Sequence, residues 1–431
     1  MLRLRWEIDF KETNIGAIPK DWNVSRIADV AEVSSGGTPS RKVKEYWNGT
    51  INWLKSQEVR NRFIYETEEK ISKEGMNNSN AKRVYNPGTV VLALYGATAG
   101  EAGLLKTRST INQALAALEG KNECDNRFLF YSLLSSKERL LLETVGAAQQ
   151  NLYLKTIKDF ALAKPEVKEQ FRIASALSWF DDLIENKKRQ NEVLEKTAMA
   201  VFKSWFIDFE PFKNNGFANS EIGEIPKEWD VSPLEEAATL FKGVSYSSPD
   251  ISSEPQGNLF ITLNNFLREG GFKLEYDYYI GSKAKEEHKV KEGDLIIALT
   301  DMTPQAKVVG SPAIVSLPYG YVFGVISLDC GKLQLRKECL RFYLYLYLKH
   351  TQEENSTFAN GVNVLHLNTN LFMRNKLILM PPESILEKFH SFVEPLFRKI
   401  ALNQKQTLIL RRVRDTLLPL LVFGKLRVEE I

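Results

Sequence analysis

The sequence contains one short box twice, 207 residues apart. IGAIPKDWNVS begins at Ile15 and IGEIPKEWDVS begins at Ile222, and eight of their eleven positions are identical. Self-similarity at a fixed offset is the signature of a duplicated structural unit. The chain has 431 residues, and one domain commonly takes ~100–200 residues, so the length alone favours two or three domains. We therefore expect two halves that are built on one plan.

The two halves agree again further along the chain. NPGTVVLALYG (residues 86–96) and KEGDLIIALTD (residues 291–301) each place a glycine turn before an apolar, β-branched run. This pattern predicts a buried strand in each half, with Gly88 corresponding to Gly293 at an offset of 205. Each half then closes with an alternating strand, a proline and a helical pattern. The sequence thus predicts a β-rich domain followed by a helix, twice.

The two helical patterns are long, covering residues 166–206 and 383–421. Their apolar and neutral residues recur at the 3–4 spacing of a coiled-coil seam. About 40 helical residues span ~60 Å, so we expect each long helix to pack against the other. Polar pairs in mid-seam, Lys187/Asn191 and Asn403/Thr407, are of the kind that fixes register and partner. The seam positions are Leu177, Phe180, Ile184, Lys187, Asn191, Leu194, Ala198, Val201 and Trp205 in the first helix, and Val393, Leu396, Ile400, Asn403, Thr407, Leu410, Arg414, Leu417 and Leu421 in the second.

The predicted fold class is α+β, with two β-rich domains that are each followed by a long α-helix. We place the first domain at residues 1–163, the central helix at 164–207, a linker at 208–221, the second domain at 222–380 and the C-terminal helix at 381–431. The linker is predicted from the Pro, Gly and Asn turn signals in DFEPFKNNGFANSE.

The motifs of several enzyme classes are missing. An adenine methyltransferase requires a glycine-rich cofactor loop and an (N/D)-P-P-(Y/F) box, and the chain has neither of these nor a P-loop. The four histidines lack metal-ligand spacing, and the acidic run at residues 66–70 is typical of a solvated face. Three cysteines without a CxxC pair argue against a disulfide framework. We expect a chain without catalytic activity or metal.

The terminal and apolar segments indicate a cytoplasmic protein. The N-terminus, MLRLRWEIDF, has no apolar h-region and no cleavage site. No run of ~18–20 apolar residues, the length of a membrane-spanning helix, is present.

Basic, aromatic and amide residues cluster in the stretches where the two halves diverge, at residues 46–65, 80–86, 241–248 and 259–279. Lys and Arg neutralise phosphates, while Asn, Gln and Arg contact base edges. Residues 397–414 add six basic and no acidic residues, although the net charge of the chain is only +3. These residues favour contact with nucleic acid or with an acidic partner. The alternative is a β-rich domain with an aromatic core, solvated cations and an exposed helix face.

The combination of motifs resembles the specificity subunits of type I restriction–modification enzymes, over nearly the whole chain. The residues that carry the resemblance are the two boxes, SGGTPSR, VVLALYGATAGEAGLL, TINQAL and VFKSWFIDFEP, which stand in the family's order. The resemblance implies two target-recognition domains that each bind one half of a split, asymmetric site on double-stranded DNA. It also implies that the long helices pair antiparallel and act as a spacer.

The same resemblance implies the partners. Two modification subunits dock along the helices and supply S-adenosylmethionine binding and N6-adenine methylation, while restriction subunits add ATP- and magnesium-dependent translocation and cleavage. The chain itself would bind no cofactor. The competing interpretation is a non-catalytic scaffold that binds proteins through its two β-rich domains.

The resemblance also implies functional residues, which are assigned here by matching the family's motifs to this sequence position by position. The predicted DNA contacts in the first half are Gly36, Gly37, Thr38, Pro39, Ser40, Arg41, Tyr95, Gly96, Thr98, Asn112 and Gln113. In the second half they are Lys242, Ser245, Tyr246, Asn264, Asn265, Thr300 and Thr303. The helix positions predicted to serve partner docking are Phe180, Ile184, Asn191, Leu194, Ile400, Asn403, Leu410 and Arg411.

Overall fold

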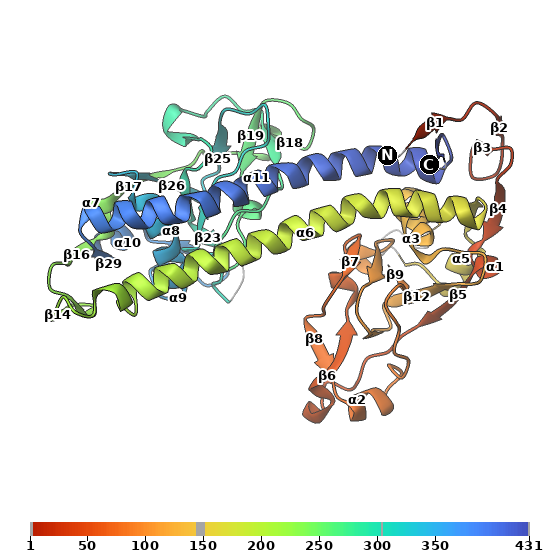
Figure 1. Cartoon of the computed structure of the whole chain (residues 1–431), viewed down its shortest axis with the longest axis horizontal. Helices are drawn as coiled ribbons and strands as arrows, with labels where there is room; N and C mark the ends of the chain where they lie inside the picture. The colour runs from red at the N-terminus through yellow and green to blue at the C-terminus, as the bar shows by residue number, and fades with distance from the viewer. Residues whose placement is uncertain (1–2, 144–150, 303–304, 430–431) are drawn as a thin grey trace. The chain divides into compact units, whose positions relative to one another are not determined.

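The computed structural model describes residues 3–143, 151–302 and 305–429. The chain divides into two compact units, the first comprising Met1–Ile184 with Leu410–Ile431 and the second Glu185–Ile409. Helices α6 (Val167–Phe206) and α11 (Glu383–Val422) have 40 residues each, and both units contain a part of each helix (Figure 1). The helical patterns at residues 166–206 and 383–421 therefore match both long helices to within one residue at each end, whereas the segment placed at 381–431 also contains strand β30 (Leu426–Val428) after the helix. The combination of sheets and helices confirms the α+β class.

The first unit contains a five-stranded sheet of order β5-β12-β9-β10-β7 and a three-stranded sheet of order β11-β6-β8. Every residue of β9 is buried, as its β-branched sequence VVLA predicts, and Gly88 makes the preceding turn at φ +94°. Helix α3 (Asn126–Ser135) contacts this sheet through β9, β10 and β12. The strands are β5 (Ala31–Ser35), β6 (Trp47–Leu54), β7 (Arg62–Ile64), β8 (Glu69–Ile71), β9 (Val90–Ala93), β10 (Ala102–Leu105), β11 (Ser109–Ile111) and β12 (Leu115–Gly120).

The second unit contains a four-stranded sheet of order β17-β26-β22-β24, and helix α8 (Leu340–His350) contributes to the same core. Its other large sheet has the order β18-β20-β19-β25-β21, and a small sheet has the order β23-β28-β27. The strands are β17 (Ala238–Lys242), β18 (Ile251–Ser252), β19 (Asn258–Ile261), β20 (Asp277–Tyr279), β21 (Lys289–Val290), β22 (Leu295–Ala298), β23 (Thr300–Asp301), β24 (Pro312–Ile314), β25 (Gly324–Ile326), β26 (Cys330–Leu335), β27 (Ala359–Asn360) and β28 (Leu365–Leu367).

The two units share one strand topology. In the first, β5 pairs antiparallel with β12, and β11 pairs parallel with β6; in the second, β17 pairs antiparallel with β26, and β25 pairs parallel with β19. Each unit also pairs the strand that begins at the end of its repeated box with the strand before its long helix. These pairs are β4 (Asn23–Arg26) with β13 (Ala161–Lys164), and β16 (Asp230–Pro233) with β29 (Leu377–Met380). The duplication in the sequence is therefore a duplication of structure.

The repeated box forms the same hairpin in both units. Strand β2 (Phe10–Lys11) pairs with β3 (Ile18–Pro19), and β14 (Phe217–Ser220) pairs with β15 (Gly223–Pro226). The turn glycines, Gly16 and Gly223, adopt φ +100° and +111°, a region that side chains with a Cβ rarely enter. The tryptophans of the box, Trp22 and Trp229, are buried. The glycine, the tryptophan and the Ile-Pro pair that the two boxes share are thus turn and core residues.

The seam between α6 and α11 lies where the heptads predict it. None of its eighteen predicted positions is exposed. In the second unit, Lys187 Nζ donates to Gln406 Oε1 (2.5 Å) and Asn403 Nδ2 donates to Asn191 Oδ1 (2.9 Å). Residue numbers rise along α6 as they fall along α11, so the pairing is antiparallel. Asn403 is fully buried, and one polar pair of each helix therefore meets the other inside the seam.

The shorter segments complete both units. Strand β1 (Leu4–Trp6) pairs with β30 (Leu426–Val428), so both ends of the chain lie in the first unit. The predicted linker 208–221 is not fully extended, because it contains a 3-10 turn at Glu210–Phe212 and strand β14, and Phe212 is buried. The remaining helices are α1 (Ile27–Val30), α2 (Lys73–Asn77), α4 (Lys137–Leu142), α5 (Leu154–Asp159), α7 (Leu234–Ala237), α9 (Gln352–Ser356) and α10 (Thr369–Asn375).

Candidate nucleic-acid interface

The loop after β5 in the first unit carries the predicted contacts Gly36–Arg41. Its glycines serve packing: a Cβ on Gly36 would lie 1.9 Å from the carbonyl oxygen of Ile111, and Gly37 accepts a hydrogen bond from Trp53 Nε1 (2.9 Å). Gly37 and Pro39 are buried, Gly36 and Thr38 are half-buried, and Ser40 and Arg41 are exposed. The outer part of this loop is therefore the part that a ligand can reach.

Arg41 is held in place before any ligand arrives. Its guanidinium carbon lies 3.6 Å from the ring centroid of Trp47, and its Nη2 donates to Glu69 Oε1 (3.2 Å). The pKa of the Glu69 carboxyl is lowered, first by its hydrogen bond with Arg41, an effect that outweighs burial, and then by Lys55. The guanidinium remains 55% exposed, so its free edge can reach a phosphate or a guanine, although the pair with Glu69 offsets part of its charge.

The other two predicted segments of the first unit lie beside this loop. The backbone N–H of Leu94 donates to the carbonyl of Ala114 (2.9 Å), which places Tyr95 next to the 112–114 connection. Thr38 Oγ1 donates to Gln113 Oε1. Tyr95, Gly96 and Gln113 are exposed, whereas Thr98 and Asn112 are half-buried. Three segments that are far apart in sequence thus form one cluster of loops.

In the second unit, the corresponding loops meet at a residue that the sequence did not single out, Asp329. Tyr246 Oη donates to Asp329 Oδ2 (3.5 Å), and Thr300 Oγ1 donates to Asp329 Oδ1 (3.1 Å). Lys242, Ser245 and Tyr246 are exposed on this cluster. The β25–β26 connection contains Asp329 but no Asn-Gln pair like the one after β11. No sequence motif therefore indicated this residue.

Two of the predicted contacts in the second unit are corrected by the structure. Asn265 is 1% exposed, and its side chain is occupied by the backbone N–H of Thr262 and by the carbonyls of Lys273 and Glu275. Thr300 is buried beneath Asp329. Both residues are internal supports of the loops, because their polar atoms already bond to protein. Asn264 is exposed, and Thr303 lies outside the described residues.

The helix positions predicted for partner docking lie mostly inside the helix pair. Ile184 and Asn403 are buried, and the other six are half-buried: Phe180, Asn191, Leu194, Ile400, Leu410 and Arg411. Asn191 and Asn403 bond to each other across the helix pair, and the half-buried positions leave part of their surface open to a partner.

Three of the six basic residues in the run of α11 pair with carboxylates of the same unit. Arg414 pairs with Asp181, and Lys405 lies 3.2 Å from Glu292. Arg398 Nη2 lies 2.7 Å from Glu394 Oε1 one turn away. These carboxylates offset the charge that the local sequence suggests, and α11 is therefore a weaker candidate for phosphate binding than the loops.

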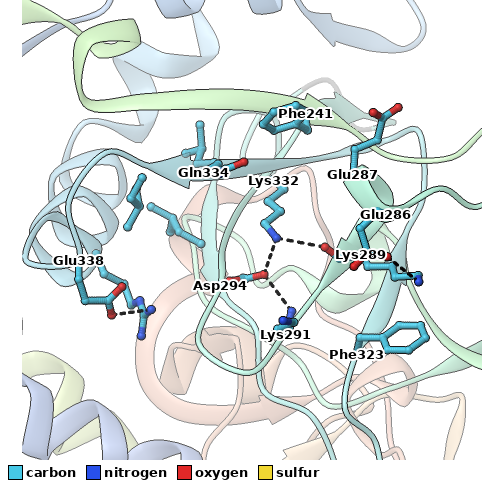
Figure 2. A pocket seen from close by; sticks show the side chains of 14 residues that line it. Phe241, Glu286, Glu287, Lys289, Lys291, Asp294, Phe323, Lys332, Gln334 and Glu338 are labelled. Carbon is cyan, nitrogen blue, oxygen red and sulfur yellow. Dashed lines mark hydrogen bonds and ion pairs between the residues drawn. The ribbon is translucent and has the colours of Figure 1, made fainter.

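A cavity of about 620 Å³ opens in the second unit between β21, β26 and α8 (Figure 2). Its cations are matched by neighbouring carboxylates: Lys332 Nζ lies 2.9 Å from Asp294, Lys289 Nζ lies 2.7 Å from Glu286, and Arg341 pairs with Glu338. Because the charges are balanced inside the cavity, it is not an attractive site for a polyanion.

Neither a metal centre nor a membrane span is found in the part of the chain that the structure describes. No group of three His, Cys, Asp or Glu side chains there could hold a metal ion. No helix within the described residues is both long enough and apolar enough to cross a bilayer. Burial raises the pKa of the Cys124 and Cys330 thiols to about 12, which keeps both protonated and unreactive at neutral pH.

Two clusters of loops thus hold equivalent places in the repeated frame, one in each unit. Comparison with known proteins specifies the class. Residues 19–196 match the family described as Type I restriction modification DNA specificity domain. The chain is 36% identical to the MjaIX specificity subunit of Methanocaldococcus jannaschii, with 100% of this chain and 99% of that protein covered. The MjaVIII specificity subunit of the same organism is 26% identical, with 99% and 97% covered.

The chain therefore belongs to the family of type I restriction enzyme specificity subunits, as the motifs predicted. Its fold is also that of a solved relative. The crystal structure of a type I restriction–modification S subunit from M. genitalium superposes with a TM-score of 0.55 at 16% identity, over 98% of each chain.

Proposed function

We propose that each unit binds one half of a bipartite, asymmetric DNA site and that the helix pair sets the gap between the halves. The observation that carries this proposal is the pair of equivalent loop clusters, one on each copy of a repeated frame, with different side chains. A repeated frame accommodates two like partners, while divergent loops suit two unlike half-sites. In this proposal the chain has no catalytic activity of its own. Two modification subunits supply S-adenosylmethionine and methylate adenine N6, and restriction subunits add ATP- and magnesium-dependent cleavage.

A row of exposed residues on α6, beside the seam, is the observation that favours docking of the modification subunits there. Each member of the row lies one residue before a seam position. The row comprises Trp179, Leu183, Asn186, Gln190, Val193, Thr197 and Ala200. All seven are exposed and none is charged. The matching positions of α11, at the offset of 216, are Pro395, Lys399, Leu402, Gln406, Ile409, Val413 and Thr416, with one charge among them. An uncharged row beside a coiled-coil seam suits packing against further helices.

Val193 and Ile409 occupy matching positions in these two rows and are 63% and 48% exposed. We expect Val193→Asp and Ile409→Asp each to weaken binding of one modification subunit at least tenfold, because a carboxylate would be buried at the contact. Native mass spectrometry of the complex should then show one copy where the parent chain binds two. Lys196→Asp, an exposed position of α6 outside the row, is the matched control. Retention of two copies by both variants would contradict this docking surface.

The spacing role predicts the effect of lengthening the helix pair. The variant has four residues inserted in α6 between Lys187 and Asn191 and four in α11 between Asn403 and Gln406. It keeps the contact of Lys187 with Gln406 on one side of the insertion and that of Asn191 with Asn403 on the other. Each helix gains ~6 Å, and we expect the gap between half-sites to widen by one or two base pairs of ~3.4 Å. The measurement is the methylated motif, mapped across genomic DNA by single-molecule sequencing. An active complex with an unchanged gap would rule out the spacing role.

The competing function, a scaffold that binds protein through its loops, differs in its salt dependence. Phosphate contacts release counterions, so the affinity for DNA should fall steeply as salt rises. We expect the affinity of the complex for its specific DNA site to fall at least tenfold between about 50 and 200 mM salt. This is roughly the decrease that two phosphate contacts produce, and more contacts produce a larger one. No specific binding at any salt concentration would favour the scaffold.

A further inference from the structure

The connection after β11 and the connection after β25 hold the same place in the two units. In the first unit, the backbone N–H of Leu94 donates to the carbonyl of Ala114 (2.9 Å); in the second, the N–H of Leu299 donates to the carbonyl of Asp329 (2.8 Å). The N–H of Gly37 bonds to the last residue of β11 (3.0 Å), and the N–H of Val244 bonds to the last residue of β25 (2.8 Å). Residues 112–114 therefore correspond to residues 327–329.

The two connections differ in the polar side chain that each carries. The side chains stand one position apart in this register, because Gln113 corresponds to Leu328 and Asp329 to Ala114. The first unit presents Gln113, an exposed amide whose oxygen accepts from Thr38 and whose nitrogen is a donor. The second unit carries Asp329, which is half-buried and whose carboxylate form is an acceptor only. An amide can pair with a base edge that offers both a donor and an acceptor, whereas a carboxylate can pair only with a donor.

Asp329 retains capacity to accept a further hydrogen bond. A carboxylate offers about four lone-pair sites, and the protein supplies one donor to each oxygen, Thr300 at 3.1 Å and Tyr246 at 3.5 Å. The Tyr246 ring is 36% exposed at the edge of the same cluster. The pKa of Tyr246 is raised, first by burial and then by the charge of Asp329, so the phenol stays protonated and remains a donor. Both neighbours orient the carboxylate without using up its acceptor sites.

We propose that Asp329 is a specificity-determining residue of the second unit and accepts a hydrogen bond from the exocyclic amino group of a base in its half-site. The inference rests on the proposed function, because it requires this unit to face DNA. In the major groove only cytosine N4 and adenine N6 offer such a donor. A carboxylate near guanine O6 or thymine O4 would face an acceptor, and near a phosphate it would face another negative charge. Asp329 therefore selects cytosine or adenine at one position.

The test replaces Asp329 by asparagine in the full chain, produced together with its modification subunit. Asp329→Asn keeps the size of the side chain and exchanges one acceptor for a donor. Single-molecule mapping of N6-methyladenine should show cytosine or adenine at one position of one half-site in the parent motif. In the variant, we expect methylation at sites with another base there to rise about tenfold or more relative to parent sites, as the loss of one base contact predicts. The other half-site should not change.

Asp230→Asn is the control for a non-specific effect of the exchange. It makes the same chemical change at an exposed position of β16, outside the loop cluster, so the base preference should be retained. If Asp329→Asn lowers methylation at every site and keeps the parent motif, Asp329 only supports the loop and the inference is wrong. If Asp329→Asn does not assemble, Asp329→Ser replaces it under the same criterion. A parent chain without a bipartite motif would reject the proposed function itself, whereas a bipartite motif that neither Asp329 variant alters would reject only this inference.

Discussion

Replacing Arg427 by alanine is expected to destabilise the first unit by about 3 kcal/mol, because the change leaves buried carboxylates without their cation. Arg427 pairs with Glu169, Glu7 and Asp21, and its side chain is only 14% exposed. Two of these carboxylates, Glu169 and Glu7, are themselves largely buried. The guanidinium also lies 5.6 Å from the ring of Trp22, whose indole N–H donates to Glu169 (3.0 Å). One side chain thus joins β30, the repeated box and α6.

Hydrogen exchange in rising urea is the appropriate measurement, since it reports each unit separately. Segments of the first unit should open at lower urea in Arg427→Ala, and segments of the second unit should not change. Arg3→Ala is the matched control, because the side chain of Arg3 is 81% exposed in its pair with Glu429. An exposed pair of this kind contributes ~0–1 kcal/mol. Equal effects of the two substitutions would show that the Arg427 network does not stabilise the unit.

The effect of Arg427→Ala should also depend on pH. The pKa of Asp21 is lowered, first by its hydrogen bond with Arg427; the pKa of Glu7 is lowered because backbone N–H donors and Arg427 outweigh its burial. Groups with depressed pKa values contribute stability that is fully present above their unfolded values of about 4 and lost as the pH falls through the folded values. The difference between the parent and Arg427→Ala should therefore be constant near neutral pH and shrink below about pH 4. A difference that grew in acid would contradict this assignment.

The sequence predicted the frame of the molecule well because the frame repeats and is periodic. The heptads located every seam position, and the glycine-led apolar runs located β9 and β22. The pairing of β1 with β30 could not be predicted in this way, because it joins residues more than 400 positions apart with no periodic signal.

The candidate site was predictable only in part. The motifs located the loops, but they could not separate residues that support a loop from residues that it presents. Asn264 and Asn265 are adjacent and chemically identical, yet only Asn264 is exposed. Asp329 carried no motif, and its place in the cluster follows from backbone hydrogen bonds that the two units share. Burial and hydrogen-bond saturation, which decide what a ligand can reach, are properties of the folded loops rather than of the local sequence.

The shared frame also leads to the prediction with the largest effect on specificity. In the first unit, the chain enters the recognition region on β5 and leaves it on β12, where Ala31 and Gly120 are paired. In the second unit, it enters on β17 and leaves on β26, where Ala238 and Leu335 are paired. Each region is thus closed at its base by one antiparallel pair, and the helices that hold it lie outside the segment. Residues 31–120 can therefore be replaced by a second copy of residues 238–335 at matching ends.

We expect the resulting chain to direct methylation to an interrupted palindrome in which the second half-site occurs twice, in inverted orientation, with the parental gap. The physical reason is that, under the proposed function, two identical loop segments on a repeated frame would bind two identical half-sites, as the two halves of a symmetric dimer do on a palindromic operator. The measurement is the N6-methyladenine motif of the host genome, compared with that of the parent. The reciprocal chain has residues 31–120 in both places and should duplicate the first half-site. It serves as a control, because an exchange that disrupted the core beneath α3 or α8 would give no methylated motif. A palindrome from either chain would show that each segment carries its own specificity. Retention of the asymmetric parental motif would mean that the bases are selected by residues outside these segments.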